Sequence, residues 1–174
     1  MSEGWARAVL GAYRWTGAAA YPLIGGYVAW RASNGKEDPV RRRERYGFAA
    51  YPRPAGPLIW MHAASVGETN AVIPLIEHIL SLGINIVLTT GTVTSASVAS
   101  ERLGDRVLHQ YVPLDLKPAV RRFLNHWAPD LAIIAESEIW PMTILELGTR
   151  RAPSSRMVIG QISDSAMIAR SGRQ

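Results

Sequence analysis

The chain has 174 residues, 48% hydrophobic and 19% charged, so a disordered or fibrous protein is excluded and the length favours a single core. Its net charge of +5 favours an anionic partner, such as nucleic acid, phosphorylated lipid or an anionic membrane surface. With no cysteine and four histidines that lack ligand spacing, disulfides and thiolate metal sites are excluded, and we expect no structural metal.

An apolar segment opens the chain. Between Val9 and Trp30 the single charged residue is Arg14, and tryptophans and tyrosines lie near the ends, as in the aromatic belts of membrane segments. As a helix, the uncharged part from Trp15 onward would be about 24 Å long, which is short for a hydrocarbon core of ~30 Å. We predict a membrane-anchor helix over residues 1–31, either a thin span or a helix lodged in one leaflet. A helix packed on the domain is the alternative.

A basic segment with four prolines follows at residues 32–57. Its basic residues include Lys36, Arg41, Arg42, Arg43 and Arg45. Basic residues directly after an apolar segment mark the cytoplasmic side, and each can attract anionic headgroups by about 1 kcal/mol near the surface. We predict a juxtamembrane linker beside anionic lipids; a solvated linker is the alternative. Nucleic acid is not expected, because the strands lack interleaved aromatic and basic residues.

Short apolar runs alternate with helix-like segments over residues 58–174. The predicted strands are Leu58–Met61, Ile84–Leu88, Val107–Val112, Leu131–Ala135 and Met157–Ile162. The predicted helices are Thr69–Leu82, Ser95–Leu103, Leu116–Trp127 and Pro141–Arg150. This alternation predicts βαβ units, and hence a parallel sheet with helices on both faces. Right-handed crossovers then favour a doubly wound, Rossmann-like α/β domain.

The stretch Ser65-Val66-Gly67-Glu68-Thr69 follows the first predicted strand and leads into a helix. Ser65 and Glu68 have the spacing of a capping box, in which the serine caps the helix and the glutamate reaches back. The carboxylate also lies where open α/β sheets bind substrates, just past the end of a strand. From spacing alone, the cap and a catalytic role both remain open.

Polar residues after the next two strands should converge on the same edge of the sheet. The hydroxyl and N–H groups of Thr89–Ser95 could hold a sugar or phosphate at a helix entrance. For Thr94 or Ser95, capping that helix is the simpler role. After the third strand, Asp115 is expected to cap the helix that starts at Leu116, because aspartate is a preferred N-cap residue.

Two carboxylates, Glu136 and Glu138, directly follow the fourth apolar run. Carboxylates in that position are costly unless they are paired or exposed in a cleft. Pro141 suits the first turn of a helix, which places Glu138 near a helix start, where negative charge is favoured. We therefore predict that at least one of the two is functional. Dinucleotide, Walker-type and nucleophile-elbow sites lack their motifs.

Four motifs occur in order along the chain: Ser65–Thr69, Thr89–Thr92, Tyr111–Asp115 and Glu136–Pro141. Together with Arg45-Tyr46-Gly47 upstream, they resemble the amino-terminal domain of the Kdo (3-deoxy-D-manno-octulosonic acid) transferases of lipopolysaccharide synthesis. The resemblance implies a two-domain, inverting glycosyltransferase of the GT-B type at the cytoplasmic face of the inner membrane. Such an enzyme transfers Kdo from CMP-Kdo to the lipid A precursor (lipid IVA), and its active site needs no metal or other cofactor.

By this resemblance the domain is the acceptor-binding half of the enzyme. Glu68 would be the general base, and Glu136 or Glu138 would be the second essential carboxylate. The implied substrate-binding residues are Ser65, Gly67, Thr69, Thr90, Gly91, Thr92, Asp115 and Arg45. The two roles of the first motif then become compatible, because Ser65 can cap the helix while Glu68 faces the cleft at its positive end.

Two departures from the family pattern affect the expected activity. The sequence ends about where the first domain of the family ends, so CMP-Kdo is expected to bind through a carboxyl-terminal donor domain supplied elsewhere. The fifth strand carries Gln161 where an Asn-Gly-Arg-Ile-Ser pattern would have arginine, which removes an expected cation. We predict the acceptor-side half of a Kdo transferase. The alternative is a catalytically inactive truncated product or a membrane-bound lipid-binding module.

Overall fold

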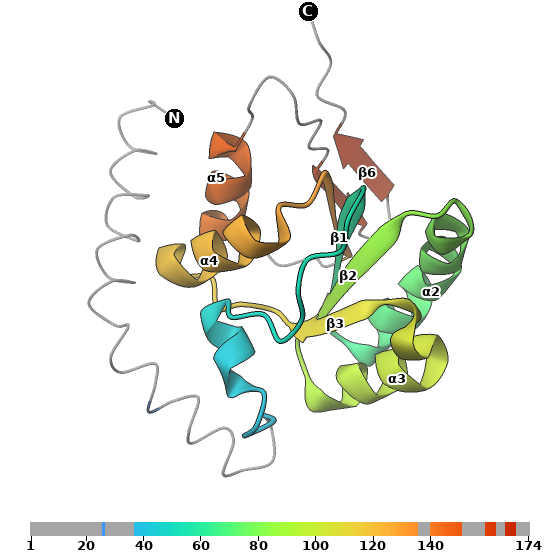
Figure 1. The fold of residues 1–174 in the computed structure, drawn as a ribbon, viewed down its shortest axis with the longest axis horizontal. Coiled ribbons are helices and arrows are strands. Elements are labelled where there is room, and N and C mark those ends of the chain that lie inside the picture. The colour runs from blue at the N-terminus through green and yellow to red at the C-terminus, as the bar shows by residue number, and fades with distance from the viewer. Residues whose placement is uncertain (1–25, 27–36, 136–139, 151–158, 163–165, 170–174) are drawn as a thin grey trace, which may run out of the picture.

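A six-stranded sheet is the centre of the computed structural model, which describes residues 26, 37–135, 140–150, 159–162 and 166–169 (Figure 1). The strand order is β3-β2-β1-β4-β5-β6. The strands are β1 (Leu58–Ala63), β2 (Asn85–Thr90), β3 (Leu108–Tyr111), β4 (Leu131–Ala135), β5 (Ile159–Ile162) and β6 (Ala166–Ala169). The first five run parallel and β6 is antiparallel to β5. The predicted parallel α/β sheet is confirmed.

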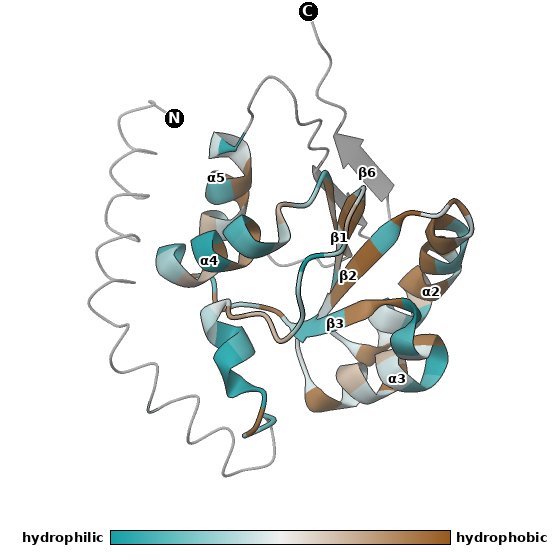
Figure 2. Ribbon diagram, in the orientation of Figure 1, coloured by the Kyte–Doolittle hydropathy of each residue, from teal (hydrophilic) through white to brown (hydrophobic). Residues whose placement is uncertain are grey.

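The helices cover both faces of the sheet (Figure 1). They are α2 (Val66–Ser81), α3 (Val93–Leu103), α4 (Lys117–Trp127) and α5 (Pro141–Thr149), with short 3₁₀ helices η1 (Arg42–Tyr46) and η2 (Gly104–Arg106). Because side chains alternate along a strand, β1 contributes to both layers. Met61 packs in the cluster with α2 and α3, whereas Trp60 packs with α4 and α5. Figure 2 shows β1 and β2 as largely hydrophobic and η1 and α4 as more hydrophilic.

The structure adds one strand to the predicted elements. Strand β6 was not predicted, because its apolar run is only four residues long and lies between polar residues. The predicted anchor over residues 1–31 lies outside the described residues, apart from residue 26. Within the part of the chain that the structure describes, none of the helices is long and apolar enough to cross a membrane.

The segment from residue 37 to residue 57 is packed on the domain, so the fold begins upstream of the boundary predicted at residue 58. Glu44 and Arg41 cover the outer edge of β3: a carboxylate oxygen of Glu44 accepts the N–H of Tyr111 at 2.7 Å, and Arg41 donates to the carbonyl of His109 at 2.8 Å. Such contacts occupy the backbone groups of an edge strand that could otherwise pair with another chain. Residues predicted as a linker therefore complete the sheet edge.

Gly47 fixes the other side of this segment. It ends η1 with a φ of 81°, and a Cβ atom there would lie 2.1 Å from the carbonyl oxygen of Ala119 in α4. Only glycine combines that backbone conformation with so close an approach. The basic segment is thus held between β3 and α4.

Candidate functional site

The carboxyl end of β1 forms the predicted capping box, which the structure confirms. The hydroxyl of Ser65 accepts the N–H of Glu68 at 3.3 Å, and Oε2 of Glu68 accepts the N–H of Ser65 at 2.9 Å. The same oxygen also accepts the N–H of Ala64 at 2.8 Å. Among the described residues, Oε1 of Glu68 has no hydrogen-bond partner. The carboxylate is therefore fixed by one oxygen at the amino terminus of α2.

The neighbours of Glu68 divide into exposed and buried residues. Ser65 and Gly67 are exposed at the sheet edge, where a substrate could reach them. Thr69 is fully buried, and its hydroxyl donates to the carbonyl of Ser65 at 2.8 Å. Ser65 and Gly67 are thus accessible to a substrate, whereas Thr69 holds the loop in place from inside the domain.

The loop after β2 packs directly on the loop after β1. The N–H of Gly91 donates to the carbonyl of Ala64 at 3.2 Å, and a Cβ atom on Gly91 would lie 2.9 Å from that oxygen. Thr92 is the N-cap residue of α3, since its hydroxyl accepts the N–H of Ser95 at 3.1 Å. The expectation that Thr94 or Ser95 would be the cap was wrong. Gly91 and Thr92 lie beside the Glu68 loop, as predicted for one shared edge.

Thr90 is buried, and its hydroxyl points away from that edge into a half-buried polar cluster. Its hydroxyl lies 2.9 Å from Nε2 of His109, and Nδ1 of His109 lies 3.0 Å from the guanidinium of Arg41. Because arginine can only donate, Nδ1 must accept and Nε2 must carry the proton. Burial, with the charge of Arg41 acting in the same direction, lowers the pKa of His109 from 6.5 to about 4. The imidazole is therefore held neutral.

Arg45 is buried and its guanidinium is used within the protein. It donates to both carboxylate oxygens of Glu37 at 2.8 and 3.1 Å, to the carbonyl of Gly91 at 2.6 Å and to that of Val112 at 3.2 Å. It also lies over the ring of Tyr111. The resemblance implies that Arg45 binds substrate, but in the structure its guanidinium is bonded to the loops that follow β2 and β3 from inside the protein.

Asp115 caps a different helix from the one predicted. Its carboxylate accepts the N–H of Met142 at 2.9 Å, the N–H of Thr143 at 2.7 Å and the Thr143 hydroxyl at 2.8 Å, at the start of α5. The α4 N-cap residue, Leu116, has no side-chain cap, and a proline occupies the first turn of α4. Proline lacks an N–H group, so that turn has less need of an acceptor.

Glu136 and Glu138 lie outside the described residues, so their predicted convergence on Glu68 stays a prediction. The described residue after them, Trp140, lies edge-on to the ring of His62 on β1, with 5.7 Å between ring centroids. His62 is buried and lies within 3.0 Å of the carbonyl and the hydroxyl of Thr89. Trp140, the residue before α5, therefore packs against the central strand.

The comparison with known families decides the identity of the domain. The family described as 3-deoxy-D-manno-octulosonic-acid transferase (kdotransferase) matches residues 40–171. The chain belongs to this family. The match begins within the basic segment, in agreement with its place in the fold. The matched residues therefore include most of the basic segment and all six strands of the sheet.

Curated relatives carry the same family name. The chain is 44% identical over 126 residues to a probable 3-deoxy-D-manno-octulosonic acid transferase, mitochondrial, of Arabidopsis thaliana, covering 71% of this chain and 28% of the relative. It is 38% identical over 137 residues to the 3-deoxy-D-manno-octulosonic acid transferase of Haemophilus influenzae, covering 76% and 32%. It is 32% identical over 130 residues to that of Bordetella pertussis, covering 71% and 30%. The chain thus spans about a third of the length of these relatives.

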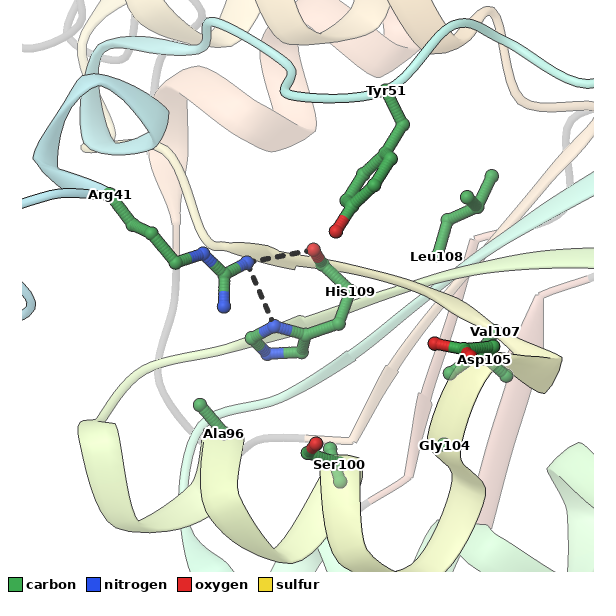
Figure 3. A pocket seen from close by; sticks show the side chains of 10 residues that line it. Arg41, Tyr51, Ala96, Ser100, Gly104, Asp105, Val107, Leu108 and His109 are labelled. Carbon is green, nitrogen blue, oxygen red and sulfur yellow. Dashed lines mark hydrogen bonds between the residues drawn. The ribbon is translucent and has the colours of Figure 1, made fainter.

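This kdotransferase domain also contains a cavity that the sequence did not indicate. It has a volume of about 380 Å³ and lies at the outer side of β3, where Arg41, Tyr51 and His109 face α3 (Figure 3). None of its lining residues is among the substrate-binding residues that the resemblance implies. Among the described residues, no group of three His, Cys, Asp or Glu side chains could hold a metal ion. The candidate site of this kdotransferase domain is therefore the edge that carries Glu68.

Proposed function

We propose that this chain is the acceptor-side part of a Kdo transferase, with Glu68 as the general base. The reaction is the transfer of Kdo from CMP-Kdo to the lipid A precursor (lipid IVA) in lipopolysaccharide core synthesis. The observation that carries the proposal is the Glu68 carboxylate at the carboxyl edge of the central strand, with one oxygen held by two N–H groups. Membership of the kdotransferase family supports the choice of sugar.

In the proposed step, a hydroxyl oxygen of the acceptor attacks the anomeric carbon of Kdo. The bond from that carbon to the phosphate oxygen breaks, CMP leaves with the electron pair, and the configuration at the carbon inverts. Glu68 takes the hydroxyl proton on Oε1, the oxygen that makes no hydrogen bond within the described residues. A base within about 2.6–3.2 Å of that hydroxyl typically contributes a factor of about 10² to 10⁴.

The remaining parts of the proposal come from the family pattern. Glu136 or Glu138 is the second essential carboxylate, and the step uses no metal or other cofactor. A carboxyl-terminal domain of a GT-B enzyme binds CMP-Kdo. Residues 1–31 anchor the chain at the cytoplasmic face of the inner membrane, where anionic lipids attract its basic segment. Ser65, Gly67, Gly91 and Thr92 line the acceptor side of the cleft.

A test is Kdo transfer from labelled CMP-Kdo to lipid IVA, measured with the chain alone and with the carboxyl-terminal part of the Haemophilus influenzae relative added. We expect transfer in the supplemented reaction, and a loss of about 100-fold or more in kcat for Glu68→Gln. Glu77→Gln is the matched control, because Glu77 is an exposed glutamate on the same helix that contacts Arg106. Wild-type activity in Glu68→Gln would refute the base assignment.

The second candidate is a catalytically inactive, membrane-bound lipid-binding module. Gln161 favours it, because this uncharged residue lies on β5, in register with Ile134 of β4, where the family pattern has a cation. The supplemented assay separates the two. A lipid-binding module would bind vesicles that contain lipid IVA and would transfer no Kdo in any combination. For an enzyme that needs a cation at this position, Gln161→Arg should raise Kdo transfer.

A further inference from the structure

The peptide group between Ala64 and Ser65 connects the Glu68 carboxylate to helix α3. Its N–H, on Ser65, donates to Oε2 of Glu68 at 2.9 Å. Its carbonyl, on Ala64, accepts the hydroxyl of Ser95 at 3.0 Å and the N–H of Gly91 at 3.2 Å. A peptide group is planar and rigid. Fixing its carbonyl from one side therefore fixes the direction of its N–H on the other.

Ser95 holds this peptide through a directed series of hydrogen bonds. Its side chain is fully buried, and the single hydrogen of its hydroxyl is donated to the carbonyl of Ala64. The hydroxyl of Thr92 is also hydrogen-bonded to that of Ser95, so Thr92 must be the donor in that pair. The series runs from Thr92 through Ser95 and the peptide to Glu68, and each bond polarises the next.

Gly91 makes this short connection possible. Because a Cβ atom at that position would lie 2.9 Å from the carbonyl oxygen of Ala64, a side chain there would push the two loops apart. The close approach brings the first turn of α3 within reach of the β1 loop. Ser95 lies in that turn, with its own N–H capped by Thr92.

We propose that Ser95 is a positioning residue for the Kdo transfer step, acting on Glu68 through the Ala64–Ser65 peptide. The inference rests on the proposed function, since it assigns Ser95 the task of holding the Glu68 carboxylate in the direction in which Oε1 meets the acceptor hydroxyl. A misplaced catalytic group costs rate rather than binding, and a displacement of about 1 Å can cost about 10²-fold.

The first measurement needs no catalysis. Amide hydrogen exchange of the chain by NMR should show the Ser65 N–H exchanging about five- to tenfold faster in Ser95→Ala, because the carbonyl of its peptide loses a hydrogen bond. Ser81→Ala is the matched control. It removes a hydroxyl that likewise donates to a backbone carbonyl, that of His78 at 2.7 Å, at the other end of α2, and should leave this amide unchanged. An unchanged Ser65 amide in Ser95→Ala overturns the inference.

The second measurement is steady-state Kdo transfer in the supplemented assay. We expect Ser95→Ala to lower kcat about tenfold with KM within about twofold, and Ser95→Thr, which keeps the hydroxyl, to restore most of kcat. A kcat that falls equally in Ser81→Ala, or in proportion to melting temperature, overturns the inference. If Glu68→Gln loses activity while Ser95→Ala keeps it, the inference fails alone. If Glu68→Gln stays active, the base assignment fails, and the positioning role with it.

Discussion

The half-buried His109 makes the stability of the fold depend on acidity in a calculable way. Its Nδ1 accepts a hydrogen bond from Arg41 at 3.0 Å, so a second proton on the ring would point at a guanidinium. Burial, with Arg41 adding to it, lowers the pKa of His109 from 6.5 to about 4. The folded chain therefore binds this proton less readily than the unfolded chain, and acid favours unfolding.

The magnitude follows from linkage between protonation and folding. The difference between 6.5 and about 4 corresponds to about 3 kcal/mol, at about 1.4 kcal/mol for each tenfold change in proton affinity. Because the pKa of His109 is lower in the folded state, this contribution to the free energy of unfolding is fully present above pH 6.5. It is lost as the pH falls from 6.5 to about 4.

The assay is urea unfolding at about pH 7 and about pH 4.5, with the free energy of unfolding compared between wild type and His109→Asn. Asparagine keeps an acceptor near the position of Nδ1 and cannot take up a proton. We expect wild type to lose about 2–3 kcal/mol more than the variant between the two conditions. Subtracting the variant removes the contribution of carboxylates that titrate in the same range.

His78→Gln is the control, because His78 lies exposed on α2. Its loss between the two conditions should equal that of wild type. The reasoning is refuted if His109→Asn loses as much stability as wild type on acidification, because the ring would then take up its proton equally well in both states.

Two further substitutions test contacts outside the candidate site, each by thermal unfolding. Gly47→Ala should cost clearly more than Gly83→Ala: both glycines have a positive φ, which costs about 1–2 kcal/mol for alanine, but only at Gly47 would Cβ meet backbone atoms. Equal costs would contradict the packing of η1 on α4. Asp115→Ala should cost about 1–2 kcal/mol, as for a lost N-cap, and speed amide exchange at Met142 and Thr143. Faster exchange in α4 instead would support the helix assignment made from sequence.

The sequence predicted the strands well because burial on both faces leaves an apolar run with clear ends. Leu131–Ala135 matches β4 at both ends. The capping box was also predictable, since both of its partners lie within one turn. The role of Asp115 was not. The sequence does not show whether an aspartate caps the helix that follows it or a helix 27 residues away. Only the fold decides between the two.

The basic segment shows a second limit of sequence reasoning. Its arginines suggested an anionic partner outside the protein, yet Arg41 and Arg45 pair with Glu44 and Glu37 of the same segment. These carboxylates are visible in the sequence, but pairing depends on how the chain turns at η1. A buried guanidinium whose donors are met by carbonyls of neighbouring loops holds those loops in place. Arg45 lies close to the candidate site because it holds the loops after β2 and β3 in place.

Glu68 shows how one side chain can be both structural and reactive. A cap needs only one carboxylate oxygen, and Oε2 accepts both N–H groups, from Ala64 and Ser65. A general base also needs one oxygen, and it works best when the carboxylate cannot rotate away from the proton it must take. The hydrogen bonds that start α2 therefore supply the fixed orientation that the base requires. Ser95 extends that support by one further hydrogen bond, so the first turns of α2 and α3 hold the proposed base together.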